Sequence, residues 1–179
     1  MFYFQERIGY KNSKFRIIKF ATMLKNSPNI GTKLHTTITD PRVLPFGKFL
    51  RSTKINELPQ LFNILIGDMS IVGPRPLVDK TFEPYSENIK NSIYNIKPGL
   101  SGIGSVIFRN EEELMSNTQM NLDDYYREKI APLKGELELW YQKNISFITD
   151  FKIILITIWI VLFPKSNIIN LFFKNLPKK

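Results

Sequence analysis

The sequence has no cysteine and a single histidine, His35, among its 179 residues. Without cysteine the chain has no disulfide scaffold and no thiolate chemistry. One histidine argues against a histidine-based metal site and against a Ser/His catalytic triad. The chain also lacks the ~20 apolar residues in a row that a membrane-spanning helix needs. The uncharged run at 153–163 has only eleven residues.

Positive charge and apolar side chains are what the sequence has in abundance. Its net charge is +9, and 43% of its residues are apolar. A chain of this length and apolar content is expected to form one folded domain with a sizeable core. A basic surface attracts polyanions, so charge alone leaves both nucleic acid and anionic lipid open as partners.

Local patterns predict one β-hairpin near the N-terminus. Residues 2–8 and 14–20 are rich in aromatic and β-branched types and flank a turn at 9–13. Residues 25–47 carry several prolines and glycines, so we expect a loop there. Mostly helical patterns follow, and the expected fold is a compact, predominantly helical α+β domain.

The stretch 56–67 predicts a short helix. Asn56 suits its N-cap, because the side-chain oxygen can accept a hydrogen bond from a first-turn N–H. Pro59 fits only the first turn, and Gly67 suits the C-terminal end. Its four large apolar residues fall on one face at helical spacing: Leu58, Leu61, Phe62 and Leu65.

Further along the chain, a short helix is predicted at about 80–92 and a turn-rich segment at 98–104. The stretch 122–143 predicts a longer helix with one apolar stripe, which Pro132 should kink or break. The triplet of glutamates at 111–113 is typical of a solvated face, and the glycines at 99–104 are a weak signal for a phosphate-binding loop.

The C-terminal part is strongly apolar at 145–163 and predicts a re-entrant, interfacial or buried core helix. Residues 145–179 are therefore expected to contact a membrane, and residues 1–150 to form the main domain. Basic residues near anionic lipid contribute ~1 kcal/mol each. The alternative is a core helix followed by a frayed basic tail. Five lysines and no acid occur from residue 151 onward, at positions 152, 165, 174, 178 and 179.

Chemistry is predicted around the helix that begins at Asn56. A helix N-terminus carries unpaired N–H groups and partial positive charge, and Glu57, Arg51 and Arg75 accompany it. A carboxylate among arginines suits a phosphoryl site with a divalent metal. A capped helix with surface ion pairs is the interpretation that this pattern alone favours. Asp68 could bind metal, cap a turn or pair with Arg75.

A longer set of motifs resembles one known family. The chain is similar to the bacterial sugar transferases, the monotopic polyprenyl-phosphate phosphoglycosyl transferases. The strongest agreement lies in FLRSTKINELPQLFN at 49–63 and GDMSIVGPRP at 67–76. Further agreement lies in FQERIG at 4–9, FRIIKF at 15–20, DPRV at 40–43, KPGLSG at 97–102 and the stretch 125–152.

The resemblance implies a reaction in which a UDP-sugar gives its sugar-1-phosphate to polyprenyl phosphate and releases UMP. This step opens the synthesis of surface glycans such as capsule, O-antigen or exopolysaccharide, on the cytoplasmic face of the bacterial inner membrane. Family members use Mg²⁺ or Mn²⁺ and an Asp-Glu pair whose Asp attacks the phosphate. By resemblance, Glu57 is a metal ligand or acid/base, Arg75 lines the phosphate site and Lys19 is a basic residue near the same cleft. The local pattern alone adds Arg51 as a candidate phosphate contact and Asp68 as a candidate metal ligand.

Asn56 is the main departure from the family pattern, because it stands where the family has its nucleophilic Asp. An amide is not a usable covalent nucleophile at neutral pH. Three interpretations follow. The chain is inactive, Glu57 takes over the attack, or the lipid phosphate attacks directly. The intact surrounding motif favours an active enzyme.

Two smaller departures concern anchoring and charge. Family members carry a re-entrant membrane helix before the region that matches residues 4–9, and this chain starts almost inside that region. We therefore expect either a fragment or reliance on the C-terminal apolar helix. Ala21 replaces a usual arginine. The rival function is a non-catalytic subunit that holds nucleotide-sugar or lipid, or that docks on other glycan-assembly enzymes. A nucleic-acid binder ranks last, and we expect no nucleic-acid partner.

Overall fold

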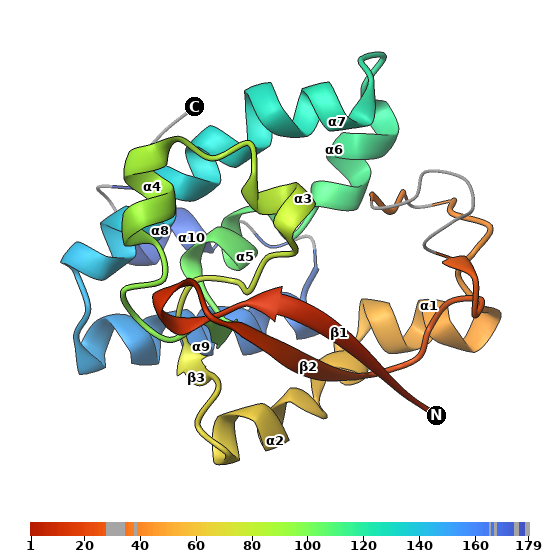
Figure 1. The fold of residues 1–179 in the computed structure, drawn as a ribbon, viewed down its shortest axis with the longest axis horizontal. Coiled ribbons are helices and arrows are strands. Elements are labelled where there is room, and N and C mark those ends of the chain that lie inside the picture. Colours follow the sequence, from red (N-terminus) through yellow and green to blue (C-terminus); the bar gives the residue numbers. More distant parts are fainter. Residues whose placement is uncertain (28–34, 38, 165, 167, 174–175, 178–179) are drawn as a thin grey trace.

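The computed structural model describes residues 1–27, 35–37, 39–164, 166, 168–173 and 176–177. Its fold is a compact, mostly helical α+β domain with an N-terminal β-hairpin, as predicted (Figure 1). The strands are β1 (Phe2–Ile8), β2 (Lys14–Phe20), β3 (Ser70–Val72) and β4 (Gly99–Ser101). The helices are α1 (Pro45–Ser52), η3 (Ile55–Glu57), α2 (Gln60–Leu65), α3 (Asp79–Phe82), α4 (Glu87–Ser92), α5 (Ile103–Ile107), α6 (Glu111–Asn117), α7 (Leu122–Tyr125), η4 (Tyr126–Ile130), α8 (Ala131–Lys143), α9 (Phe147–Leu162) and α10 (Ile169–Phe172).

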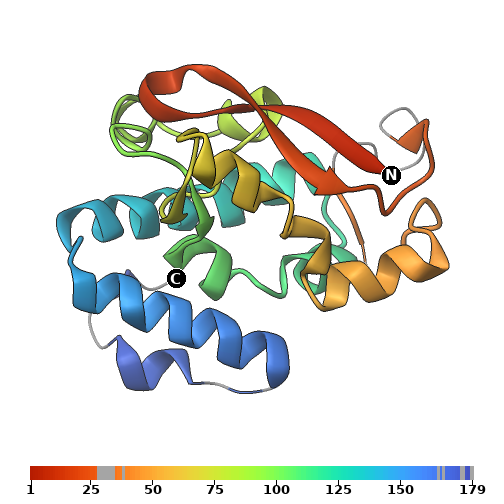
Figure 2. The ribbon, with the colours of Figure 1, turned by 90° about the horizontal axis from the view of Figure 1, so that it is seen from below.

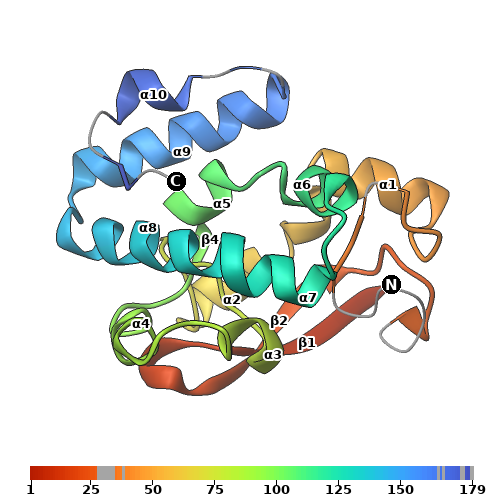
Figure 3. The ribbon, with the colours of Figure 1, turned by 90° about the horizontal axis from the view of Figure 1, so that it is seen from above.

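The elements form three layers. Figure 3 shows α9 and α10 on one side, α8 and α5 in the middle, and α3, α4 and the hairpin on the other side, and Figure 2 shows the same order from below. The middle layer carries the core, because Ile103 of α5 and Leu137 of α8 are fully buried against Ile153 and Ile156 of α9. Burial of such side chains is the main force holding helices of this length together.

The hairpin pairs β1 and β2 antiparallel, from Phe2 opposite Phe20 to Ile8 opposite Lys14. This confirms the predicted hairpin and its turn. One end is joined to the rest of the fold, because the Ile8 N–H donates to the Leu77 carbonyl at 2.8 Å. That bond brings the hairpin to the segment that follows β3.

A second, parallel pair joins β3 to β4, with Ser70 opposite Gly99 and Val72 opposite Ser101. The sequence predicted only turns at 98–104, so β4 and α5 are corrections to that prediction. Glycine is needed at the crossing, since a Cβ at Gly99 would lie 2.1 Å from the Gly73 nitrogen. The close pairing fixes the start of the segment 73–77, which carries Arg75.

The predicted single helix at 56–67 is wrong. The 3₁₀ helix η3 and the separate helix α2 replace it, and Pro59 is the N-cap residue of α2 rather than part of a longer first turn. Asn56 lies inside η3, where its side chain makes no capping bond, and Lys54 precedes η3 in the left-handed region at φ 59°. The helix-terminus argument for phosphate binding at Asn56 therefore fails, while Gly67 does adopt a positive φ of 88° after α2.

Two other helices are divided as well. The predicted helix at 80–92 is α3 and α4, which are separate because Pro84 lies between them. The predicted helix at 122–143 is α7, the π-helical segment η4 and α8, with Pro132 in the first turn of α8. The predicted loop at 25–47 ends early, because α1 begins at Pro45.

Helix α9 has one buried face and one exposed face. Ile153, Ile156 and Ile160 are buried, whereas Phe147 and Leu162 are 84% and 66% exposed. In the described part of the chain, no helix combines the length and apolarity needed to cross a membrane. Four of the lysines expected to form the basic tail, at 165, 174, 178 and 179, lie outside the described residues.

Candidate active site

Two basic residues from distant parts of the sequence, Lys19 and Arg75, meet at Glu57 and form a charged cluster with it. Lys19 of β2 donates to Glu57 Oε1 at 3.1 Å, and the Arg75 guanidinium donates to the same oxygen at 2.8 Å. A second Arg75 nitrogen lies 3.4 Å from Glu57 Oε2. The Lys19 and Glu57 side chains are 14% and 12% exposed, and Arg75 is 34% exposed. Arg75 is therefore the member of the cluster that solvent reaches most readily.

Asn63 of α2 holds this part of the chain against β2. Its amide oxygen accepts from the Ile18 N–H at 3.0 Å, and its amide nitrogen donates to the Arg16 carbonyl at 2.8 Å. The side chain is fully buried. These bonds satisfy two backbone groups on the strand that carries Lys19, so Asn63 sets the distance between β2 and the η3–α2 region. Sequence reasoning missed this role, because the partners are backbone groups that no side-chain pattern reveals.

The charges of the cluster shift one another's pKa values. Burial alone would raise the pKa of Glu57, but the charges of Arg75 and Lys19 hold it well below its usual range. Burial lowers the pKa of Lys19 to about 7, although the Glu57 carboxylate opposes this shift. The Glu57 carboxylate in turn raises the pKa of Arg75. Glu57 is therefore a fixed anion at neutral pH.

Arg7 of β1 adds a further cation beside this cluster. It donates to the Pro76 carbonyl at 3.1 Å and to the Gln5 side chain at 2.6 Å. Burial, followed by the charge of Arg75, lowers the pKa of Arg7 to about 10. Its Nε is buried without a hydrogen-bond partner in the described part of the chain. Sequence reasoning did not single out Arg7, although it falls within a stretch that matched the family.

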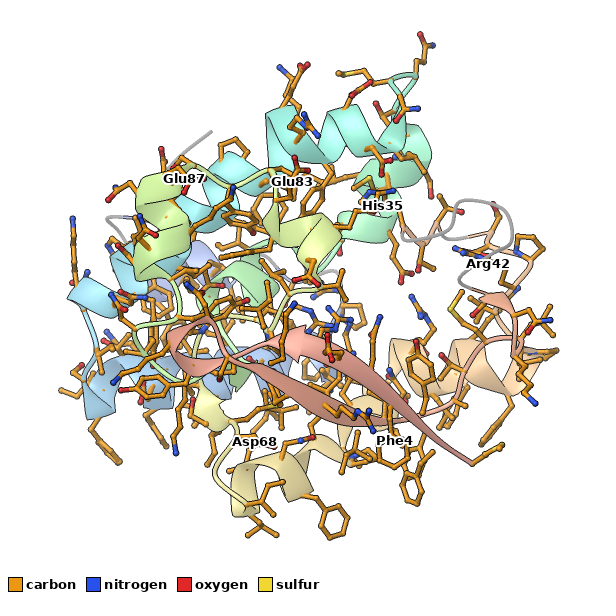
Figure 4. The ribbon with its side chains drawn as sticks, viewed as in Figure 1. Phe4, His35, Arg42, Asp68, Glu83 and Glu87 are labelled. Atoms are coloured by element: carbon orange, nitrogen blue, oxygen red, sulfur yellow. The ribbon has the colours of Figure 1, made fainter. Side chains whose placement is uncertain are left out.

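Arg51 and Asp68, both predicted at the site, make their contacts elsewhere. Arg51 pairs with Glu112 of α6. Asp68, labelled in Figure 4 below the hairpin, is 3.4 Å from the amide nitrogen of Asn63. The glutamates at 111–113 are also not simply a solvated face, because Glu112 holds Arg51 and Glu111 forms an ion pair with Lys134 at 2.5 Å.

Asn56 lies directly before Glu57 and is buried, with 8% of its surface exposed. Its Oδ1 has no hydrogen-bond partner among the residues that the structure describes. A buried amide oxygen without a partner is unfavourable, so this atom is suited to accept a ligand.

The Asn56 Oδ1 and the Glu57 carboxylate are the candidate protein ligands for a divalent cation at this site. Within the described ranges, no three histidine, aspartate or glutamate side chains are grouped so that they could hold a metal ion. Mg²⁺ is commonly held by one or two carboxylates together with water and substrate phosphates. One Glu57 carboxylate and the Asn56 amide oxygen fit that sparse pattern. Both Glu57 oxygens also lie near cations, so most of the coordination would fall to the substrate and water.

The chain belongs to the bacterial sugar transferase family, whose model matches residues 1–164. It is 32% identical over 174 residues to the undecaprenyl-phosphate galactose phosphotransferase of Salmonella typhimurium. The aligned region covers 89% of this chain and 33% of the relative. It is 34% identical over 174 residues to an uncharacterized sugar transferase of Haemophilus influenzae, with the same coverage. An uncharacterized sugar transferase of Bacillus subtilis is 34% identical over 158 residues, or 88% of this chain and 68% of the relative.

The chain thus spans about a third of the length of the Salmonella and Haemophilus relatives. The matched region contains the whole cluster around Glu57, since residues 1–164 include Lys19 and Arg75.

Proposed function

We propose that this chain transfers a sugar-1-phosphate from a UDP-sugar to polyprenyl phosphate at a membrane surface, as a first step of surface-glycan synthesis. The observation that carries the proposal is the cluster in which one buried carboxylate, Glu57, contacts Lys19 and Arg75 with Arg7 beside them. The names of several relatives specify undecaprenyl phosphate as acceptor, with galactose, glucose or N-acetylgalactosamine as the sugar. This variety of sugars supports the reaction class and leaves the sugar open.

An excess of positive charge suits this cluster to a diphosphate. Glu57 offsets one of its neighbouring cations, and the others remain partly desolvated. Buried cations are stabilised when an anion with several oxygens reaches them, and arginine is well matched to phosphate geometry. Arg75, which is the most exposed member, would contact the diphosphate of the UDP-sugar and stabilise charge as it develops there.

Direct attack by the lipid phosphate is the mechanism that the site supports best. Asn56 cannot serve as a covalent nucleophile. Glu57 is a poor substitute, because both of its oxygens lie near cations and its pKa is strongly lowered. In the proposed step, an oxygen of polyprenyl phosphate attacks the phosphorus that carries the sugar. A new P–O bond forms, the bond from that phosphorus to the bridging oxygen breaks, and UMP leaves.

Mg²⁺ or Mn²⁺ is the expected cofactor, with Glu57 and the Asn56 Oδ1 as its protein ligands. When bound, such an ion neutralises charge on a diphosphate. The role of the remaining residues is to hold and orient the substrate. Lys19 keeps Glu57 in place, while Arg75 connects Glu57 to the solvent-accessible side of the site.

Exposed apolar side chains give the proposed membrane contact. On α2, Phe62 and Leu65 are 59% and 80% exposed, and Ile66 directly after the helix is 69% exposed. Residues of β3 and the start of α9 line an open groove, and Phe147 at its edge is 84% exposed. In Figure 2, α2 lies between the hairpin and α9. Apolar surface on this scale is typical of an interaction site, and a lipid carrier supplies a membrane as the partner.

The membrane contact can be tested by flotation with liposomes that contain anionic lipid. Leu65→Glu should reduce the bound fraction several-fold, because it places a charge on the apolar face of α2. Met120→Glu is the matched control, since Met120 is 39% exposed in the turn between α6 and α7, at the opposite end of the molecule from α2 in Figure 1. Equal binding by both variants would contradict this membrane surface.

The reaction is tested by UMP release from a panel of UDP-sugars with polyprenyl phosphate and Mg²⁺ present. The native chain should release UMP, and Glu57→Gln should not. Glu113→Gln, at an exposed position of α6, is the matched control and should keep activity. Direct attack also predicts that the native chain does not exchange labelled UMP into UDP-sugar without the lipid, whereas Asn56→Asp gains that exchange. Exchange by the native chain would contradict direct attack.

A non-catalytic subunit that holds nucleotide-sugar or lipid is the second candidate, and Asn56 at the nucleophile position is the observation that favours it. This candidate predicts a silent native chain and an active Asn56→Asp variant. The same assay therefore separates the two functions.

A further inference from the structure

The segment 73–77 that carries Arg75 has almost no freedom on its β4 side. The Gly73 N–H donates to the Ser101 carbonyl at 2.9 Å, and the Gly99 N–H donates to the Pro74 carbonyl at 2.9 Å. Pro74 and Pro76 have no N–H to offer, so the remaining donors of the segment are those of Arg75 and Leu77. What holds the other side of the segment decides where the Arg75 side chain points.

Two bonds from β1 reach that other side, from the Ile8 N–H to the Leu77 carbonyl and from Arg7 to the Pro76 carbonyl. Tyr94, which follows α4, is the residue that bonds the Arg75 backbone there, through its hydroxyl group. The Tyr94 hydroxyl donates to the Arg75 carbonyl at 2.8 Å and accepts from the Leu77 N–H at 2.9 Å. Its ring is 1% exposed and packs against Phe82, with ring centroids 5.7 Å apart. Burial raises the pKa of Tyr94, so the hydroxyl keeps its proton and remains a donor at any ordinary pH. One atom thus binds the chain on both sides of Pro76.

The hydroxyl matters for the direction of Arg75 because the carbonyl it holds belongs to Arg75 itself. Rotation of the peptide after Arg75 would break the bond to Tyr94 and swing the guanidinium away from Glu57, which it meets at 2.8 Å. Phenylalanine would fill the same apolar space and keep the ring contact. The hydroxyl therefore contributes two hydrogen bonds to the backbone that packing of the ring alone does not supply.

We propose that Tyr94 is a positioning residue for Arg75, which holds the guanidinium where it meets both Glu57 and a substrate phosphate. This inference rests on the proposed function for its catalytic consequence. It adds a residue outside the charged cluster, from a different part of the chain, to the set on which phosphate recognition depends.

The test is a double-mutant cycle of Tyr94→Phe and Arg75→Ala with two readouts, kcat/KM for the UDP-sugar and the affinity for inorganic pyrophosphate. Small misplacements of a catalytic group lower rates by up to about 100-fold, so we expect Tyr94→Phe to lose about 10- to 100-fold in kcat/KM. Pyrophosphate should also bind more weakly. In the Arg75→Ala background, Tyr94→Phe should cause no further loss in either readout. A loss that is the same in both backgrounds would overturn the proposal.

Tyr141→Phe is the control for a merely structural effect. Tyr141 is 2% exposed, and its hydroxyl donates to the Asp150 side chain at 2.7 Å and lies 3.5 Å from the Val72 carbonyl. Removing this hydroxyl should lower thermal stability but leave the pyrophosphate affinity within about 3-fold of native. A 3-fold change in affinity corresponds to ~0.6 kcal/mol. Equal losses of affinity in Tyr94→Phe and Tyr141→Phe would overturn the positioning role. A native chain that binds pyrophosphate but never turns over would reject the proposed reaction, while the affinity cycle still decides the role of Tyr94.

Discussion

Glu138 of α8 should make the fold less stable as the pH rises. Its side chain is 4% exposed, and its Oε2 has no hydrogen-bond partner in the described part of the chain. Burial raises the pKa of Glu138 to about 8, although Lys134 and the backbone N–H groups of Arg75 and Gly104 favour the carboxylate. At neutral pH this carboxyl therefore keeps its proton in the folded chain.

The sign of the effect follows from proton counts. In the unfolded chain the pKa lies near its usual 4.5, so between pH 4.5 and pH 8 the folded chain binds more protons than the unfolded chain. Stability must then fall as pH rises through that window and level off above pH 8. At 1.36 kcal/mol per pKa unit, this titration removes roughly 3 kcal/mol between pH 5.5 and pH 8.5.

Comparison with Glu138→Gln isolates this group from the other titrations. Glutamine resembles the protonated carboxyl in shape and does not ionise, so the two proteins should have similar stability at pH 5.5. At pH 8.5 the variant should be more stable by roughly 3 kcal/mol relative to that starting difference. The measurement is urea unfolding at pH 5.5, 6.5, 7.5 and 8.5. A stability difference that stays constant over this range would refute the buried, protonated Glu138.

Three further predictions concern stability, each measured by urea unfolding. Asp40→Asn should cost roughly 3–5 kcal/mol, because it removes the buried carboxylate that pairs with the Arg42 guanidinium at 2.5 Å; a loss below 1 kcal/mol would contradict this. Gly47→Ala should cost roughly 1–3 kcal/mol, because its Cβ would lie 2.1 Å from the Thr22 carbonyl oxygen and force α1 to move. Asn63→Ala should cost about 1–3 kcal/mol by leaving two strand groups unpaired, and an unchanged midpoint would contradict its bracing role.

The parts of the fold that sequence reasoning found are those set by local pattern. The hairpin was predicted correctly because two segments rich in aromatic and β-branched residues flank a polar turn, and the pairing from Phe2 to Phe20 needs only neighbouring chain. The apolar run before residue 163 also formed a helix, α9, near its expected place. Its two-faced burial was not predictable, because nearly all of its residues are apolar and the partners α5, β3 and β4 come much earlier in the sequence.

Errors arose where tertiary contacts overrode helical spacing. Residues 56–67 have a helical pattern, yet η3 ends at Glu57 and α2 begins at Gln60, and the Glu57 side chain is held by Lys19 of β2 and by Arg75. This division directs Glu57 toward β2, while the apolar stripe that the pattern revealed is exposed on α2 rather than buried. The parallel pair of β3 and β4 was missed because three-residue strands have too short a pattern to detect.

Binding and turnover depend on different atoms of this site. The contacts that assemble Lys19, Glu57 and Arg75 do not involve the side chain at position 56. Replacing an aspartate by an asparagine at this position therefore leaves the charged cluster intact. The neighbouring Asn56 Oδ1 is the atom that changes in chemical character, from a possible nucleophile to a neutral acceptor. Affinity for a diphosphate should therefore persist whether or not the chain turns over, because it follows from the cations. Position 56 decides the route of phosphoryl transfer, and for that reason the pyrophosphate and UMP-exchange measurements give independent answers.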